Sequence, residues 1–182
     1  MYGLIHQAIR GSIIADHGDE GWERVFRKSG LDESAFVSMQ AYDDEVSFGL
    51  VGAAVEALGL EVDDFLYRFG IYWVTRTAKE EYGAIMSLGG STMREFLRNL
   101  DAMHEQVALT FTNLDQPSFR VEREEEDSVL ISYQSSRDGL SKFVEGLLQG
   151  LAIHFGETVE VEVTARKSEG AACDEFLVKK AG

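Results

Sequence analysis

The clearest pattern of apolar and polar positions lies in residues 91–111, STMREFLRNLDAMHEQVALTF. Apolar side chains recur there at helical spacing and form one stripe: Met93, Phe96, Leu97, Leu100, Met103, Val107, Ala108 and Phe111. Thr92 and Glu95 have the spacing of a capping box, so the segment predicts a helix with a well-defined start. His104 lies within the stripe, where an unpaired imidazole nitrogen would cost about 1–3 kcal/mol. The pattern is compatible with a core histidine bonded to a carbonyl or with a single metal ligand in an apolar pocket.

Earlier segments of the chain also have helical periodicity. Their apolar spacing predicts helices over residues 2–15, 19–29, 44–58, 62–77 and 78–88. Gly18, Gly30 and Gly59 are placed to end three of these helices, because glycine readily adopts the left-handed conformation of a helix end. The helix over 44–58 carries a face of small residues, which favours close approach of another helix. The helix over 62–77 is rich in aromatic side chains, among them Trp73, which suit either plain core or the wall of a pocket for a flat ligand.

After residue 117 the periodicity changes to the two-residue alternation of strands. Strands are predicted over 118–123, 128–134, 158–165 and 174–180, with a helix over 138–155 between the second and the third. Helices followed by a small antiparallel sheet with one inserted helix indicate an α+β fold. We expect a single domain over residues 1–182, made of an N-terminal helical lobe (about 1–63) and a C-terminal lobe with the sheet (about 64–182).

Composition and charge exclude several classes of function. The net charge of −15 and the absence of any basic cluster argue against nucleic-acid binding. No apolar run approaches the length of a membrane span and no signal pattern begins the chain, so we expect neither a membrane segment nor export. The single cysteine, Cys173, excludes an internal disulfide and suits the cytoplasm. His6 and His17 have no partner histidine at metal-ligand spacing, and both are interpreted as surface or helix-end residues.

A second group of polar residues follows the strand over 128–134. Tyr133, Ser135 and Arg137 alternate along the chain, so in an extended segment they point to one side. A phenol, a hydroxyl and a guanidinium converging in this way suit a carboxylate, with charge-assisted bonds contributing about 1.5–3 kcal/mol each. An ordinary strand end with a solvated arginine would have the same pattern.

Taken together and in order, several short motifs resemble the haem nitric oxide/oxygen binding (H-NOX) family, which includes the sensor domain of the soluble guanylate cyclase β subunit. The matching motifs are MYGL at 1–4, WE at 22–23, YDD at 42–44, FLRNLDAMH at 96–104, PSF at 117–119 and YQSSRDGL at 133–140. The resemblance covers essentially the whole chain. It implies haem b (iron protoporphyrin IX) between the two lobes, with His104 as the proximal iron ligand.

The resemblance assigns further residues to the haem pocket. By the family's pattern Tyr133, Ser135 and Arg137 bind the propionates, and Pro117 and Phe119 pack on the porphyrin, with Pro117 pressing it out of plane. The positions that match the distal pocket are Leu4, Ile9, Trp73, Phe143 and Leu147. In members that hold oxygen a distal tyrosine donates a hydrogen bond to it, and Phe143 stands in its place without a donor. The indole N–H of Trp73 is the one donor left on that wall.

The expected function is therefore that of a gas sensor and not of an enzyme. We expect nitric oxide, and also CO, to bind at ferrous haem and to weaken or break the bond from iron to His104. The signal then passes to a separate protein, as in stand-alone bacterial members, with a histidine kinase favoured over a diguanylate cyclase. The alternatives are an oxygen-binding or redox haem sensor on the same fold and a haem-free interaction module. A haem enzyme is disfavoured because no histidine matches a distal acid–base position.

Overall fold

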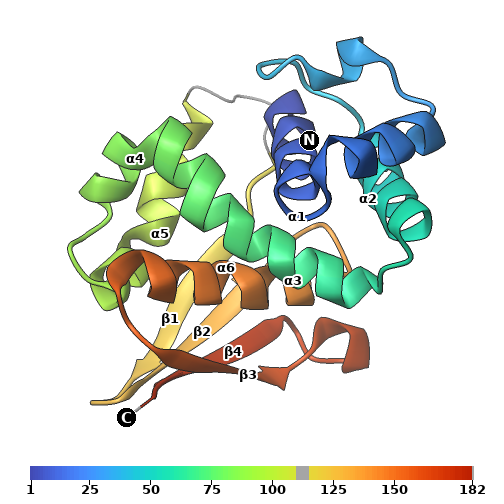
Figure 1. Ribbon diagram of the computed structural model, residues 1–182. Helices are drawn as coiled ribbons and strands as arrows, with labels where there is room; N and C mark the ends of the chain where they lie inside the picture. The colour runs from blue at the N-terminus through green and yellow to red at the C-terminus, as the bar shows by residue number, and fades with distance from the viewer. Residues whose placement is uncertain (110–114, 182) are drawn as a thin grey trace. The chain divides into compact units, whose positions relative to one another are not determined.

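The computed structural model describes residues 1–109 and 115–181, and these form two compact units, Met1–Phe65 and Leu66–Gly182 (Figure 1). The boundary between the units lies beside the one expected after residue 63. The α+β class is confirmed, with helices and one four-stranded antiparallel sheet. Phe111, the last apolar position of the stripe predicted over 91–111, lies outside the described residues.

The first unit is helical, and glycines end its helices as predicted. It contains α1 (Gly3–Ser29), the short 3-10 helix η1 (Glu33–Phe36) and α2 (Asp44–Leu58). Gly18, with φ 68° and ψ −179°, interrupts α1 where the sequence predicts a break between two helices. Gly30 and Gly59 adopt the left-handed conformation just after α1 and α2.

The interpretation of His6 as a surface or helix-end residue is wrong. Its side chain is fully buried, with Nδ1 2.6 Å from the carbonyl oxygen of Ala35 and Nε2 2.7 Å from Oγ of Ser47. A carbonyl oxygen only accepts, so Nδ1 carries the proton and Nε2 accepts from the serine hydroxyl. Burial lowers the pKa of His6, which favours this neutral form. His6 therefore ties α1 to η1 and α2, a role that no local pattern indicates.

The second unit is built on the sheet, whose strands run in the order β1-β2-β4-β3. The strands are β1 (Ser118–Glu124), β2 (Ser128–Gln134), β3 (Val159–Ala165) and β4 (Asp174–Lys180), close to the predicted bounds. Alternate residues of β2 and β4 are buried: Val129, Ile131, Tyr133, Asp174, Phe176 and Val178. Helices α5 (Met93–Ala108) and α6 (Ser141–Phe155) complete the same core. The core therefore lies between one face of the sheet and these helices.

The helical region before α5 is less regular than the sequence predicts. In place of a single helix over 62–77, the structure has α3 (Val62–Tyr72) followed by the π-helix η2 (Trp73–Ala78). The next helix, α4 (Lys79–Leu88), is bent at Tyr82. A π-helical turn accommodates an extra residue and is often found at functional sites, and here it begins at Trp73. Periodicity alone does not reveal it, because the apolar spacing on either side remains helical.

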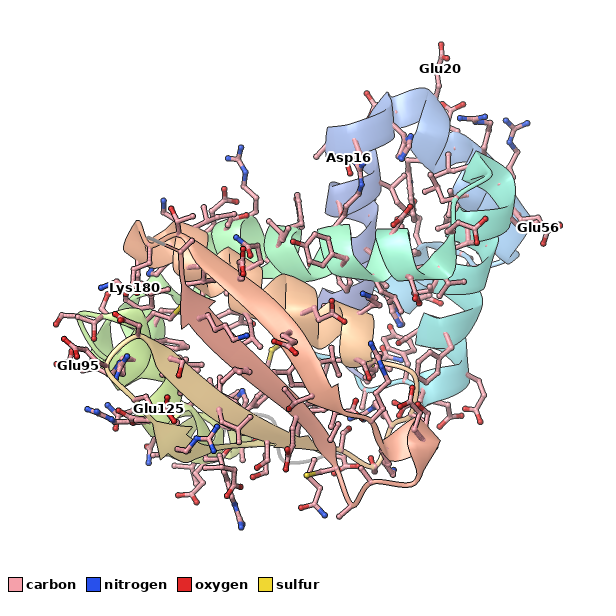
Figure 2. All side chains as sticks on the ribbon, turned by 90° about the horizontal axis from the view of Figure 1, so that it is seen from below. Asp16, Glu20, Glu56, Glu95, Glu125 and Lys180 are labelled. Carbon is pink, nitrogen blue, oxygen red and sulfur yellow. The ribbon has the colours of Figure 1, made fainter. Side chains whose placement is uncertain are left out.

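Charged side chains cover the surface. Glu20 on α1, Glu56 on α2 and Glu125 in the β1–β2 turn project outwards (Figure 2). No helix among the described residues is both long enough and apolar enough to cross a membrane.

Glycines bring α3 and α6 close together. A Cβ at Gly146 of α6 would overlap the carbonyl oxygen of Tyr67, and one at Gly70 of α3 would overlap that of Phe143. On the predicted small-residue face of α2, Ala53 and Ala54 are buried, whereas no atom lies within 4 Å of where a Cβ would stand at Gly49 or Gly52. The close approach of α3 and α6 is one that the sequence pattern does not suggest.

We predict that Gly146→Ala lowers the free energy of unfolding by about 1–3 kcal/mol, because the new methyl group forces α3 and α6 apart. Gly83→Ala, in α4 of the same unit, is the control because its Cβ meets nothing within 4 Å. It should be neutral or stabilise the protein by about 0.5–1 kcal/mol. Urea unfolding followed by circular dichroism measures both. Equal midpoints for the two variants would contradict the close packing of α3 on α6.

Candidate haem site

The helix that carries His104 begins as predicted. The Thr92 side chain accepts a hydrogen bond from the backbone N–H of Glu95 at 3.2 Å. The Glu95 carboxylate accepts from the backbone and hydroxyl of Ser91, at 2.9 and 2.8 Å, rather than from Thr92 as in a standard capping box. One apolar face of α5 is buried: Met93, Phe96, Leu97 and Leu100. These contacts fix α5 against the core and so fix the direction in which it presents His104.

His104 is a partly buried imidazole with an unsatisfied nitrogen. Its Nδ1 is buried and has no hydrogen-bond partner among the described residues. Burial lowers the pKa of His104, while the charge of Asp101 and a hydrogen bond to the backbone carbonyl of Pro117 raise it less. The neutral imidazole that results is the form that binds metals. The hydrogen bond to Pro117 fits a core histidine bonded to a carbonyl, whereas the buried and unpaired Nδ1 favours a metal ligand.

Asp101, one turn before His104, fastens α5 to the start of β1. Its Oδ1 accepts the backbone N–H of Phe119 at 2.6 Å, and its Oδ2 accepts the hydroxyl of Ser118 at 2.7 Å. The Phe119 ring lies 5.9 Å from the His104 ring, centre to centre. Pro117 immediately precedes this clamped pair. The structure therefore brings together three of the residues predicted to surround the proximal side of a haem.

Tyr133, Ser135 and Arg137 line one cavity of about 360 Å³ at the end of β2. Tyr133 is buried, which raises the pKa of its phenol and keeps it protonated as a donor. Ser135 Oγ accepts the backbone N–H of Arg137 at 3.1 Å, and the Arg137 guanidinium donates to the carbonyl of Asp115 at 2.7 Å. A site that presents a phenol, a hydroxyl and a guanidinium suits carboxylates, as the sequence pattern predicts.

The two groups of residues are joined through Phe119. Its ring centre lies 5.0 Å from that of Tyr133, besides its contact with His104. The candidate iron ligand on α5 and the carboxylate cavity at the end of β2 are thus consecutive parts of one site. The buried unpaired nitrogen and the donor-lined cavity fit a haem, which brings four nitrogen ligands of its own and two propionates.

The cavity has further polar walls that the sequence does not reveal. Lys167, Asp138 and Asp174 also line it. Asp174 is buried and accepts the backbone N–H of Lys167 at 2.7 Å and the hydroxyl of Ser141. Lys167 Nζ lies 2.7 Å from Oδ1 of Asp138. Lys167 is distant from the Y-x-S-x-R segment in sequence, so only the pairing of β2 with β4 could have suggested it.

Predicted distal residues occur in both units. In the second unit, Phe143 of α6 stacks on Phe69 with ring centres 5.2 Å apart, and Trp73 meets Phe69 edge to face at 6.4 Å. Phe69, a buried residue of the aromatic helix, thus contacts two of the predicted distal residues. Leu147 packs, partly buried, against the core of the second unit. Leu4 and Ile9 lie on α1 of the first unit, where Ile9 is buried.

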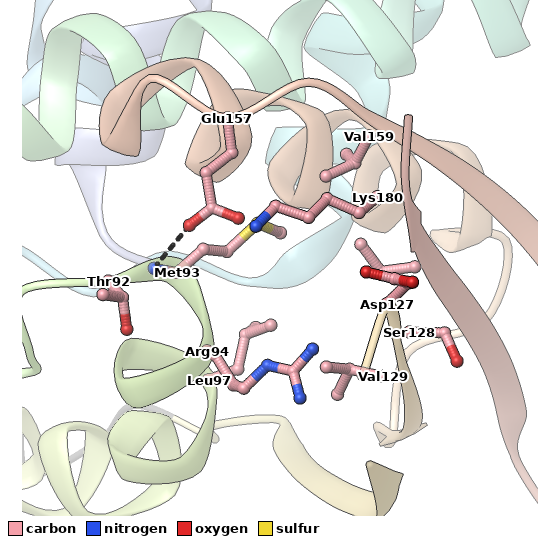
Figure 3. Close-up of a pocket in the computed structure, with 11 residues that line it drawn as sticks. Thr92, Met93, Arg94, Leu97, Asp127, Ser128, Val129, Glu157, Val159 and Lys180 are labelled. Carbon is pink, nitrogen blue, oxygen red and sulfur yellow. Dashed lines mark hydrogen bonds between the residues drawn. The ribbon is translucent and has the colours of Figure 1, made fainter. Parts of the chain in front are cut away.

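A second cavity, of about 230 Å³, lies at the opposite end of α5 (Figure 3). It is lined by the first turn of α5, the β1–β2 turn, the ends of β3 and β4 and Glu157. Glu157 accepts the backbone N–H of Met93 at 3.3 Å, the dashed line in Figure 3. Its lining includes none of the predicted site residues, so it is separate from the site at His104.

Comparison with known proteins gives one consistent result. The model of the Haem-NO-binding family matches residues 2–163. Among curated relatives, the soluble guanylate cyclases gcy-31 and gcy-37 of Caenorhabditis elegans are 28% and 30% identical over 87% and 84% of this chain. The chain spans only 22% of the length of each.

The solved structures of similar fold include H-NOX proteins. An H-NOX protein from S. oneidensis in the Fe(II)NO state superposes with a TM-score of 0.87 at 19% identity, covering 100% of both chains. An unliganded Fe(II) H-NOX protein from K. algicida gives a TM-score of 0.83 at 21% identity, covering 100% of this chain and 97% of that one. Identities this low show likeness of fold, whereas the family model matches most of the sequence directly. The chain therefore belongs to the Haem-NO-binding, or H-NOX, family of haem-based gas-sensing domains.

Proposed function

We propose that this chain is a cytoplasmic sensor that binds nitric oxide at a ferrous haem b, with His104 as the proximal iron ligand. The observation that carries the proposal is the buried Nδ1 of His104, which has no hydrogen-bond partner among the residues described. Leaving such a group unpaired costs about 1–3 kcal/mol, and metal ligation of the ring accounts for its retention. Bound haem would supply the iron that takes the gas on the face opposite His104.

The remaining residues have separate tasks in holding the cofactor. Tyr133, Ser135 and Arg137 donate hydrogen bonds to the propionates from the walls of their common cavity. Phe119 packs between the imidazole and the Tyr133 ring. Pro117 presses on the porphyrin with a ring that cannot yield by a change of rotamer. Its position is supported by the two bonds that the next two residues make to Asp101.

The route of the signal follows from what holds α5. Arg94 donates to the carbonyls of Glu125 and Glu126 at 2.7 and 2.9 Å, and Arg98 donates to the Glu124 carboxylate at 2.6 Å. Together with Asp101, these bonds fasten α5 along the β1–β2 hairpin. Loss of a bond from iron to the His104 imidazole would free α5 of that tie to the cofactor, while its bonds to the hairpin would remain. We infer that α5 and the hairpin move together and carry the signal.

The central experiment is replacement of the proposed ligand. His104→Gly should abolish the absorption spectrum of five-coordinate ferrous haem, and added imidazole should restore it by occupying the vacated space. His17→Gly is the control, because His17 is exposed on α1 of the first unit. Spectra of the ferrous proteins before and after NO measure the effect. An unchanged His104→Gly spectrum would show that another residue ligates the iron.

The choice of gas depends on the distal wall. Phe143 offers no donor to bound oxygen, which takes up negative charge and needs one, whereas NO on ferrous iron needs it much less. We propose that oxygen is therefore excluded and that NO, and also CO, bind. The second candidate is an oxygen-binding or redox sensor on the same fold, which Trp73 favours because its indole N–H stands on the same aromatic wall.

We predict that the ferrous protein forms no stable oxygen complex in air, whereas Phe143→Tyr does. One new hydrogen bond should slow oxygen release by about 5- to 150-fold, which corresponds to about 1–3 kcal/mol. Trp73→Phe, which removes the indole donor, should leave the behaviour in air unchanged. Stopped-flow absorption spectroscopy measures both. A stable oxygen complex of the unmodified protein that Trp73→Phe abolishes would favour the second candidate.

We further propose that the partner is a separate signalling protein, a bacterial histidine kinase in preference to a diguanylate cyclase. The proposal rests on the resemblance of this chain to stand-alone members of its family. Adding the NO-bound protein to such a kinase should change its autophosphorylation, while the His104→Gly variant should not. A response of diguanylate cyclase activity in place of kinase activity would reverse the preference, and no response from either would refute a partner of these two classes.

A further inference from the structure

The propionate cavity contains a cation that the Y-x-S-x-R residues do not account for. Arg137 supplies one positive charge there, whereas a haem presents two carboxylates. Lys167 lines the same cavity from the turn η3 (Lys167–Glu169), with its Nζ 3.5 Å from the carbonyl oxygen of Ser135. We propose that Lys167 is a second cationic ligand for the haem propionates, exchanging its ion pair with Asp138 for one with the cofactor. This inference rests on the proposed binding of haem at His104.

The backbone of Lys167 is fixed at the cavity wall. Its N–H donates to Oδ1 of the buried Asp174 at 2.7 Å, and the other oxygen of that carboxylate accepts the hydroxyl of Ser141. Asp174 also faces Tyr133 directly across the β2–β4 pair. The start of β4 therefore sets Lys167 beside the phenol of Tyr133. Only the flexible end of the lysine is free to change partners.

The present partner of that lysine is a weak competitor. The Asp138 side chain is 80% exposed and that of Lys167 is 49% exposed. Ion pairs between exposed side chains are screened by water and contribute little, so the ammonium group can leave Asp138 at small cost. Asp138 and Asp174 are two carboxylates on the cavity wall, and both oppose the entry of further negative charge. A second cation beside Arg137 offsets this repulsion.

The proposal predicts opposite effects at the two ends of the ion pair. Lys167→Ala should speed the loss of haem about three- to fivefold, as expected for a partly exposed charge contact. Lys167→Arg, which keeps the charge, should lose haem at nearly the original rate. Asp138→Asn removes the competitor and should slow the loss. A structural role for the Lys167–Asp138 pair would instead make Lys167→Ala and Asp138→Asn change the rate in the same direction.

The measurement is the rate of haem transfer from each holoprotein to excess apomyoglobin, followed by absorbance. Lys179→Ala is the matched control, since Lys179 on β4 makes an exposed 2.7 Å ion pair with Glu162 on β3, like that of Lys167 with Asp138. It should stay within about twofold of the unmodified protein. Repeating the transfer with haem dimethyl ester, whose propionates are uncharged, should remove the difference between Lys167→Ala and the unmodified protein.

The outcomes separate this inference from the proposed function. If the unmodified protein takes up no haem, the function itself is wrong. If it takes up haem but Lys167→Ala and Lys179→Ala release it at the same rate, Lys167 is not a propionate ligand. A difference that persists with the dimethyl ester would assign the effect of Lys167 to packing and overturn the proposal. Should Lys167→Ala fail to fold, Lys167→Gln, which keeps a long polar side chain without its charge, takes its place in each comparison.

Discussion

The proposed site depends on His104, a partly buried side chain whose Nδ1 atom has no hydrogen-bond partner among the described residues. α5 places His104 at the edge of the core, where burial lowers its pKa and leaves Nδ1 without a partner among the described residues. Neighbouring residues hold α5 in place and continue the site from His104 to the cavity at the end of β2. Asp101 fastens the helix to β1, Phe119 covers the imidazole, and Tyr133 continues the aromatic contact to the propionate cavity. The unpaired nitrogen supports our proposal that a haem iron completes the site.

The site also illustrates how charge is managed in a strongly acidic chain. With a net charge of −15, the protein as a whole repels anions. At the end of β2, however, Arg137 and Lys167 stand on one cavity wall with a protonated tyrosine. These two cations offset the carboxylates of Asp138 and Asp174 on the same wall, so the proposed propionate site can accept anions despite the overall charge, because potentials at short range are set by the nearest groups.

Much of the fold and the centre of the site could be predicted from the sequence, because they depend on local regularities. Periodicity predicts the strands, and capping residues predict the start of α5 and the ends of the helices that stop at glycines. His104 and the Tyr133–Arg137 pattern stand out for the same reason. His6 and Lys167 do not, since their roles arise from segments brought together by folding: His6 meets Ser47, and Lys167 reaches the cavity through the pairing of β2 with β4. The π-helical turn at Trp73 is not evident in the sequence because the apolar spacing on either side of it remains helical.

The glycine contacts between α3 and α6 have a mechanical consequence. At Gly70 and Gly146 the backbones of the two helices are in contact, with no side chain between them. The helices therefore cannot slide past each other. Trp73 begins the turn that follows α3 directly, and Phe143 lies one turn before Gly146, with Phe69 in contact with both rings. These aromatic side chains therefore stand on two helices whose relative position is fixed. If this wall receives a diatomic gas, as we propose, room for it comes from rotation of individual rings, because the two helices are held at a fixed spacing.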